Sequence, residues 1–145
     1  MTILFNPVGA IMNAYEKMSK NYQNLELESR INDATPHELT SMFFASLKTN
    51  IRRAQVCMEH KNIEQQSMYI NKAINIVQNL QENLDYKQGG SIAGNLNRMY
   101  NYINKQLIIG NAKNSTKELE ECYHMTNEIS DAWQQIKPAN ESNIE

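Results

Sequence analysis

Apolar residues recur along this chain at steps of three and four, the spacing that gathers them on one face of an α-helix. Turn signals interrupt the pattern, chiefly at residues 35–36, 60–62, 89–90 and 110–111. No alternation of β-branched and polar residues is present to indicate a strand. Between the turn signals, the pattern predicts helices at roughly residues 9–28, 36–60, 63–84, 91–110 and 115–136.

Capping residues mark several of these helix starts. The run Thr-Pro-His-Glu at 35–38 combines a capping threonine, a proline whose missing N–H costs nothing in the first turn, and a glutamate that closes a capping box. Ser115 with Glu118 forms a second such pair. The connections are short, so neighbouring helices should lie antiparallel. We predict an all-α fold, an antiparallel four- or five-helix bundle with up-down topology, in which residues 1–138 form one domain and 139–145 a disordered tail.

Composition narrows the classes of function. The 145 residues include 14 basic and 16 acidic side chains, a net charge of −2, so no basic excess exists to follow a nucleic-acid backbone. The first apolar run has no basic region and is broken by Asn6-Pro7, unlike a signal peptide. No stretch reaches the ~18 apolar residues of a membrane span. Cys57 and Cys122 are too few for a disulfide framework. We expect a cytoplasmic protein that neither binds nucleic acid nor inserts into a membrane.

Helical bundles can hold metal centres, and this chain has Glu, His and Cys residues that are candidate ligands. A di-iron site needs Glu-x-x-His on two helices, and the pattern occurs here once, at Glu121 and His124. Cys122 and His124 lack the spacing and companions of a zinc site. Gly89-Gly90 is followed by no Lys-Ser/Thr and is not a phosphate loop. We therefore expect no catalytic residue, no metal and no cofactor, and a protein that is not an enzyme.

The helices predicted at 63–84 and 91–110 carry more apolar residues than the single stripe of a peripheral helix requires. Two explanations fit this surplus. Either the helices are central and bury two faces against their neighbours, or part of the surplus lines grooves that receive amphipathic helices of a partner. Exposed apolar patches on a monomer commonly mark such partner sites. Periodicity alone does not separate the two.

Four stretches of sequence, read in order, carry a likeness to a known family. They are Ala34–Leu39, Lys72–Val77 with Leu84-Asp85 and Gly89-Gly90 after it, Ile92-Ala93 and Asn95-Leu96 with Tyr100 and Tyr102, and Asp131-Ala132-Trp133. In this order and spacing they resemble the FliS family of flagellar export chaperones, across roughly residues 20–137. The chain departs from that pattern in three places: Phe44-Ala45-Ser46 replaces an aromatic, an acid and glycine, Lys105-Gln106 replaces a basic pair, and roughly a dozen extra residues precede the family's usual start near Tyr22.

The resemblance implies a helical bundle without enzymatic activity that acts in the cytoplasm. Its client would be the C-terminal helical region of flagellin, which it would keep from polymerising prematurely and competent for flagellar type III secretion. Components of the export apparatus are further candidate partners. The residues expected to contact the client are Tyr22, Tyr69, Ile76, Ile92, Asn95, Leu96, Met99, Tyr100 and Tyr102.

Three hypotheses accompany this interpretation. The apolar residues of the N-terminal segment (Ile3, Leu4, Phe5 and Val8) could cover the client groove when it is empty. A metal-binding helical-bundle enzyme is an alternative function, which elemental analysis would reveal. A structural homo-oligomer is another, because it would use the same apolar surplus on a second copy of the chain.

Overall fold

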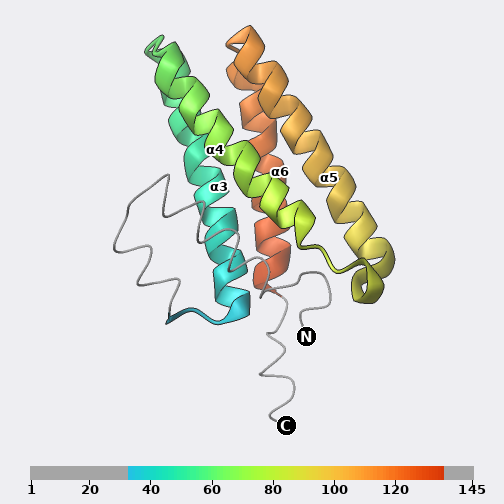
Figure 1. Ribbon diagram of the computed structural model, residues 1–145. Coiled ribbons are helices and arrows are strands. Elements are labelled where there is room, and N and C mark those ends of the chain that lie inside the picture. The colour runs from blue at the N-terminus through green and yellow to red at the C-terminus, as the bar shows by residue number, and fades with distance from the viewer. Residues whose placement is uncertain (1–32, 136–145) are drawn as a thin grey trace.

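The computed structural model describes residues 33–135, which form four α-helices and no strand within that range (Figure 1). The helices are α3 (Pro36–Glu59), α4 (Ile63–Glu82), α5 (Tyr86–Lys113) and α6 (Thr116–Gln134). The predicted all-α class is confirmed. The helix predicted at 9–28, the tail predicted at 139–145, and the N-terminal apolar segment lie outside the described residues.

Local side chains account for most of these helix starts. The Thr35 hydroxyl accepts a hydrogen bond from the Glu38 N–H at 3.1 Å, as its capping pattern predicts. Asn62 caps α4 and Asp85 caps α5 in the same way, each through a side-chain oxygen. Ser115 precedes α6 but accepts no capping hydrogen bond, and its hydroxyl donates to the Glu118 carboxylate instead.

Helix α5 consists of two helical segments that meet at Gly90. Gly90 has φ +51° and ψ −125°, which is not helical, and it separates the first turn from the long helix that follows. The predicted turn at 89–90 therefore lies inside α5. At the other end the helix continues past Gly110 to Lys113, and Asn114 ends it in the left-handed conformation at φ +52°.

Each helix packs against two others, so the four form a closed ring. Helices α3 and α5 lie diagonally opposite, and both pack against α4 and α6. His37 at the start of α3 contacts Trp133 at the end of α6, while Gln55 near the end of α3 bonds to Thr116 at the start of α6. In α4, Gln66 near the start bonds to Asn111 near the end of α5. Adjacent helices are therefore antiparallel (Figure 1).

The core lies along the axis of this ring. Its fully buried members include Leu47 and Ile51 from α3, Val77 from α4, Ile103 from α5 and Leu119 from α6. Burial of apolar side chains of this size supplies most of the stability of such a bundle. The apolar surplus divides between the two explanations above. Ile76 of α4 and Tyr100 of α5 are buried in the core, whereas Met68 of α4 and Tyr102 and Ile108 of α5 remain exposed.

Candidate protein-binding site

An apolar cavity of about 250 Å³ opens at the end of the bundle where α3 and α5 begin and α4 and α6 end. It is called the apolar pocket below. Apart from Thr40 and Glu128, all of its lining residues are aliphatic, aromatic or methionine side chains. The lining consists of Thr40, Phe44, Leu84, Ile92, Leu96, Met99, Tyr100, Glu128, Ile129, Ala132 and Trp133.

Helix α5 contributes a graded wall to the apolar pocket. Ile92, Leu96 and Met99 follow one another at steps of four and three, so they share a face of the helix. Ile92 is 52% exposed at the rim, and Leu96 and Met99 are half-buried. Tyr100 is 2% exposed, and burial raises the pKa of its hydroxyl above the ordinary value of 10.0. This wall therefore runs from an accessible apolar rim to a buried aromatic floor.

Aromatic side chains of α3 and α6 form the opposite wall. The rings of Phe44 and Trp133 meet edge to face, with centroids 6.5 Å apart and planes at 66°. The ring of His37 is also stacked on Trp133, with centroids 4.9 Å apart and planes at 13°. The indole N–H of Trp133 donates to the His37 carbonyl at 3.1 Å. The indole N–H therefore has a hydrogen-bond acceptor while the Trp133 side chain lines the apolar pocket.

The predicted contact residues divide into three groups. Ile92, Leu96, Met99 and Tyr100 line the apolar pocket together. Asn95 and Tyr102 are exposed on α5 outside the lining, and Tyr69 is half-buried on α4 beside Arg53 and Lys72. Ile76 is 7% exposed and belongs to the core. Tyr22 lies outside the described residues.

Sequence reasoning did not include the contributions of the other helices. Phe44, Leu84, Ile129 and Trp133 complete the apolar pocket from α3, the α4–α5 connection and α6. Ile129 and Trp133 are four residues apart and so share one face of α6, which is the signal that the sequence offers for them. A stripe tells which face of a helix is apolar, but it does not tell which other faces meet it.

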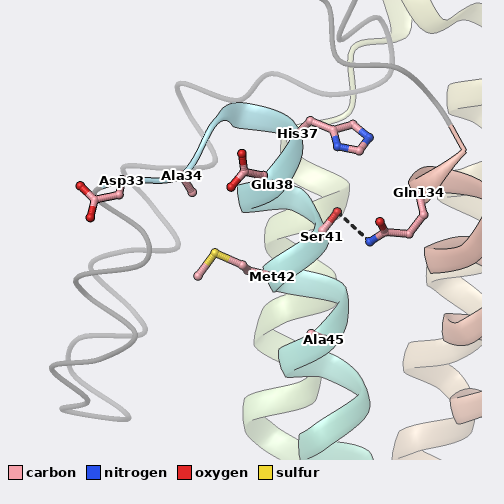
Figure 2. Close-up of a pocket in the computed structure, with 8 residues that line it drawn as sticks. All are labelled: Asp33, Ala34, His37, Glu38, Ser41, Met42, Ala45 and Gln134. Atoms are coloured by element: carbon pink, nitrogen blue, oxygen red, sulfur yellow. Dashed lines mark hydrogen bonds between the residues drawn. The ribbon is translucent and has the colours of Figure 1, made fainter. Parts of the chain in front are cut away.

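A second opening of about 570 Å³ lies beside the start of α3 and is more polar (Figure 2). Its lining includes Asp33 before α3, His37, Glu38 and Ser41 at the start of α3, and Gln134 at the end of α6. The Gln134 amide donates to the Ser41 hydroxyl at 3.1 Å across the two helices. Because charged and polar groups line this opening, the apolar pocket is the better candidate for receiving apolar side chains.

The motif residues weighed for metal chemistry are occupied in other contacts. Glu121 accepts hydrogen bonds from Tyr102 and Gln106, and the ring of His124 lies 3.0 Å from the neighbouring Glu120 carboxylate. Within residues 33–135 no three His, Cys, Asp or Glu side chains are grouped as metal ligands would be. Burial raises the pKa of the Cys122 thiol to about 12, which keeps it protonated and a poor nucleophile.

A charged seam lies at the opposite end of α3 and α6. Arg52 forms an ion pair with Glu120 at 2.6 Å, and the Gln55 amide donates to the same carboxylate at 3.0 Å. The hydrogen bonds from Arg52 and Gln55 hold the pKa of Glu120 below its ordinary value. The Arg52 guanidinium also lies 3.5 Å from the centroid of the Tyr123 ring. The Arg52–Glu120 ion pair is exposed to solvent, so it contributes little to stability, whereas Gln55 is buried between the two helices.

The fold and the apolar pocket define an all-helical protein with a site suited to apolar side chains of a partner. Within residues 33–135, no helix combines the length and apolar character that crossing a bilayer requires. A family model described as flagellar protein FliS matches residues 18–140. This chain belongs to the FliS family, and the resemblance of its four sequence stretches is confirmed.

Curated relatives agree with this assignment. Flagellar secretion chaperone FliSB of Pseudomonas aeruginosa is 34% identical over 120 residues, which cover 83% of this chain and 95% of the relative. Flagellar secretion chaperone FliS of Salmonella typhimurium is 34% identical over 120 residues, with 82% and 89% covered. The FliS of Bacillus subtilis is 31% identical over 126 residues, with 87% of each chain covered. These relatives are named as chaperones and not as enzymes, which supports an export-chaperone role and the prediction that the chain is not an enzyme.

Proposed function

We propose that this chain is a cytoplasmic export chaperone that binds the C-terminal helical region of flagellin. Bound in this way, flagellin is kept from polymerising prematurely and remains competent for flagellar type III secretion. The observation that carries the proposal is the apolar pocket, whose α5 wall consists of four predicted contact residues: Ile92, Leu96, Met99 and Tyr100. Membership of a family whose curated relatives are named flagellar secretion chaperones supports the same role.

The shape and chemistry of the apolar pocket suit a helical client. An amphipathic helix places apolar side chains at steps of three and four, and a groove lined by apolar side chains receives them as anchors. The exposed rim at Ile92 lets such a helix approach, and the buried floor at Tyr100 gives its deepest side chain an apolar surface. A client that folds as it binds loses conformational entropy, so its affinity per unit of buried area is modest. This suits a client that must later be released for export.

The structure suggests different roles for the other predicted contacts. Tyr69, Asn95 and Tyr102 have accessible surface and are proposed to extend the contact beyond the apolar pocket. Ile76 has very little accessible surface, so an aspartate there would place a charge in the core and disturb the fold. Variants at the rim of the apolar pocket are therefore the better test of client binding.

Charge introduced at the rim should abolish most of the binding. In Ile92→Asp, a carboxylate would enter the apolar interface, and we expect the dissociation constant for purified flagellin to rise roughly 100-fold. An aspartate close to the start of a helix is compatible with the helix dipole, so helicity should be preserved. Isothermal titration calorimetry gives the dissociation constant, and circular dichroism checks the fold.

Ile108→Asp is the matched control, because Ile108 lies on the same helix, is 58% exposed, and does not line the apolar pocket. It should bind flagellin as the wild type does. Wild-type affinity in a folded Ile92→Asp protein would show that the apolar pocket is not the client site. Failure of the wild-type protein to bind flagellin would refute the proposed function itself, and size-exclusion chromatography would then show whether the chain assembles with itself.

A further inference from the structure

The start of α3 and the end of α6 are joined by a reciprocal contact between His37 and Trp133. The His37 ring lies stacked on the indole, and its Nε2 is 2.9 Å from the Trp133 carbonyl oxygen. In return, the indole N–H of Trp133 donates to the His37 carbonyl at 3.1 Å. A carbonyl oxygen only accepts, so Nε2 of His37 must carry the proton in this contact. Backbone and side chain of each residue are therefore engaged by the other.

This contact holds a residue of the apolar pocket's wall from outside the pocket. Trp133 lines the apolar pocket, whereas His37 does not and instead lines the neighbouring polar opening (Figure 2). Phe44 meets the indole edge to face, so two rings from α3, Phe44 and the imidazole, contact the indole. The hydrogen bond from the indole N–H and the two ring contacts leave the Trp133 side chain little rotational freedom, and the His37 Nε2–H holds the backbone of the same residue. The position of this wall is thus set by a residue that the client need not touch.

We propose that His37 is a positioning residue for client binding: its ring, stacked on the indole, and its Nε2–H, bonded to the Trp133 backbone carbonyl, fix Trp133 in the wall of the apolar pocket. A wall that is already in place costs less ordering when a partner binds. The binding part of this inference rests on the proposed function, whereas the positioning part concerns the free protein alone.

Trp133 is the single tryptophan of the chain, so intrinsic fluorescence reports directly on this wall. In His37→Ala, the indole loses its stacked neighbour and the Trp133 backbone carbonyl loses its donor, while the indole N–H keeps the backbone carbonyl of residue 37 as its acceptor. We expect the emission to shift to longer wavelength, quenching by acrylamide to increase, and the dissociation constant for flagellin to rise roughly tenfold. His37→Phe retains a flat ring but no donor, and its emission should fall between those of His37→Ala and the wild type.

His60→Ala is the matched control, because His60 is an exposed histidine at the other end of α3. It should keep the emission and the affinity of the wild type. Unchanged emission in His37→Ala would overturn the inference, even if its melting temperature fell, because His37 would then only stabilise the helix ends. A shifted emission with the affinity of His60→Ala would overturn the role in binding. If the wild type bound no flagellin, the proposed function would fail, while the emission of both His37 variants would still decide whether His37 positions the indole.

Discussion

Gly110 is a buried glycine on α5 that faces the start of α6. A Cβ atom at this position would lie 2.4 Å from Cδ1 of Leu119 and 3.2 Å from the Ser115 carbonyl oxygen. Leu119 is itself fully buried, and the carbonyl belongs to the backbone, so neither yields easily. Gly110 therefore permits the close approach of α5 and α6, although its sequence context resembled a helix stop.

Replacing Gly110 by alanine should destabilise the protein for this reason. We expect Gly110→Ala to lower the free energy of unfolding by roughly 1–3 kcal/mol, the usual cost of overpacking a well-filled core. Urea unfolding followed by circular dichroism measures the change. Stability equal to or above that of the wild type would show that α6 can move away without loss.

The sequence predicts the local capping contacts of this chain but not which individual side chains are buried. The cap at Thr35 could be predicted because it depends on residues within one turn. The burial of Ile76 and Tyr100 could not, because it depends on the faces that neighbouring helices present. The apolar surplus on these helices was visible in the sequence, but its division into core and surface required the packed bundle.

At the scale of one element, the bend in α5 at Gly90 determines how two parts of the apolar pocket meet. Leu84 precedes the bend and Ile92 follows it, and both line the apolar pocket. The combination φ +51° and ψ −125° at Gly90 is accessible to glycine and strained for residues with a Cβ. The bend therefore positions the rim of the apolar pocket relative to the connection from α4.

Alanine at this bend should affect both stability and binding. We expect Gly90→Ala to lower the free energy of unfolding by roughly 1–3 kcal/mol and to weaken flagellin binding, because relief of the strain moves Ile92 relative to Leu84. Gly94→Ala is the matched control, since Gly94 follows in the helical part of α5 and a Cβ there meets nothing within 4 Å. That variant should gain up to about 1 kcal/mol, because alanine favours the helix. Equal stability of the two variants would contradict this account of Gly90.

Three of the four helix starts predicted within residues 33–135 lie within one residue of the observed start, whereas the start predicted at 91 falls after Gly90 and misses the first turn of α5, which begins at Tyr86. The starts predicted at 36, 63 and 115 agree with the observed Pro36, Ile63 and Thr116 to within one residue, because capping residues act locally. The helix end predicted at 110 is too early, since α5 continues to Lys113. Gly110 allows close packing against α6, and Asn114 is the left-handed residue that ends the helix. A glycine in sequence does not reveal which of these two roles it has.

At the scale of the whole molecule, the candidate site is a product of the ring of helices. The apolar pocket combines residues of α3, α5 and α6 with Leu84 from the α4–α5 connection. Hydrophobic periodicity could not predict this combination, because it does not tell which helices are neighbours. The family resemblance supplied the α5 wall, while Phe44, Ile129 and Trp133 emerged only when the antiparallel packing brought their helices together.

The same packing gives the molecule a dependence on alkaline pH. Tyr100 is buried where α5 meets the apolar pocket, and Cys122 is buried between α5 and α6, with its thiol 3.4 Å from the Ile103 carbonyl oxygen. Burial raises the pKa of Cys122 from 9.0 to about 12 and raises the pKa of Tyr100 well above 10.0. For an acid whose pKa is raised by folding, the unfolded chain loses its proton first. The stability that these groups contribute is therefore complete below their unfolded pKa values and is lost as the pH rises toward the folded values.

The free energy of unfolding should consequently fall as the pH rises from about 9 toward about 12, as measured by urea unfolding across that range. Tyr100→Phe removes one of the two ionisable groups while keeping the ring, so its stability should fall less steeply with pH than that of the wild type. Tyr86→Phe is the matched control, because Tyr86 is exposed, and it should retain the wild-type slope. If Tyr100→Phe lost stability as steeply as Tyr86→Phe, the buried hydroxyl would not be a source of the alkaline sensitivity, and the floor of the apolar pocket would have to admit water.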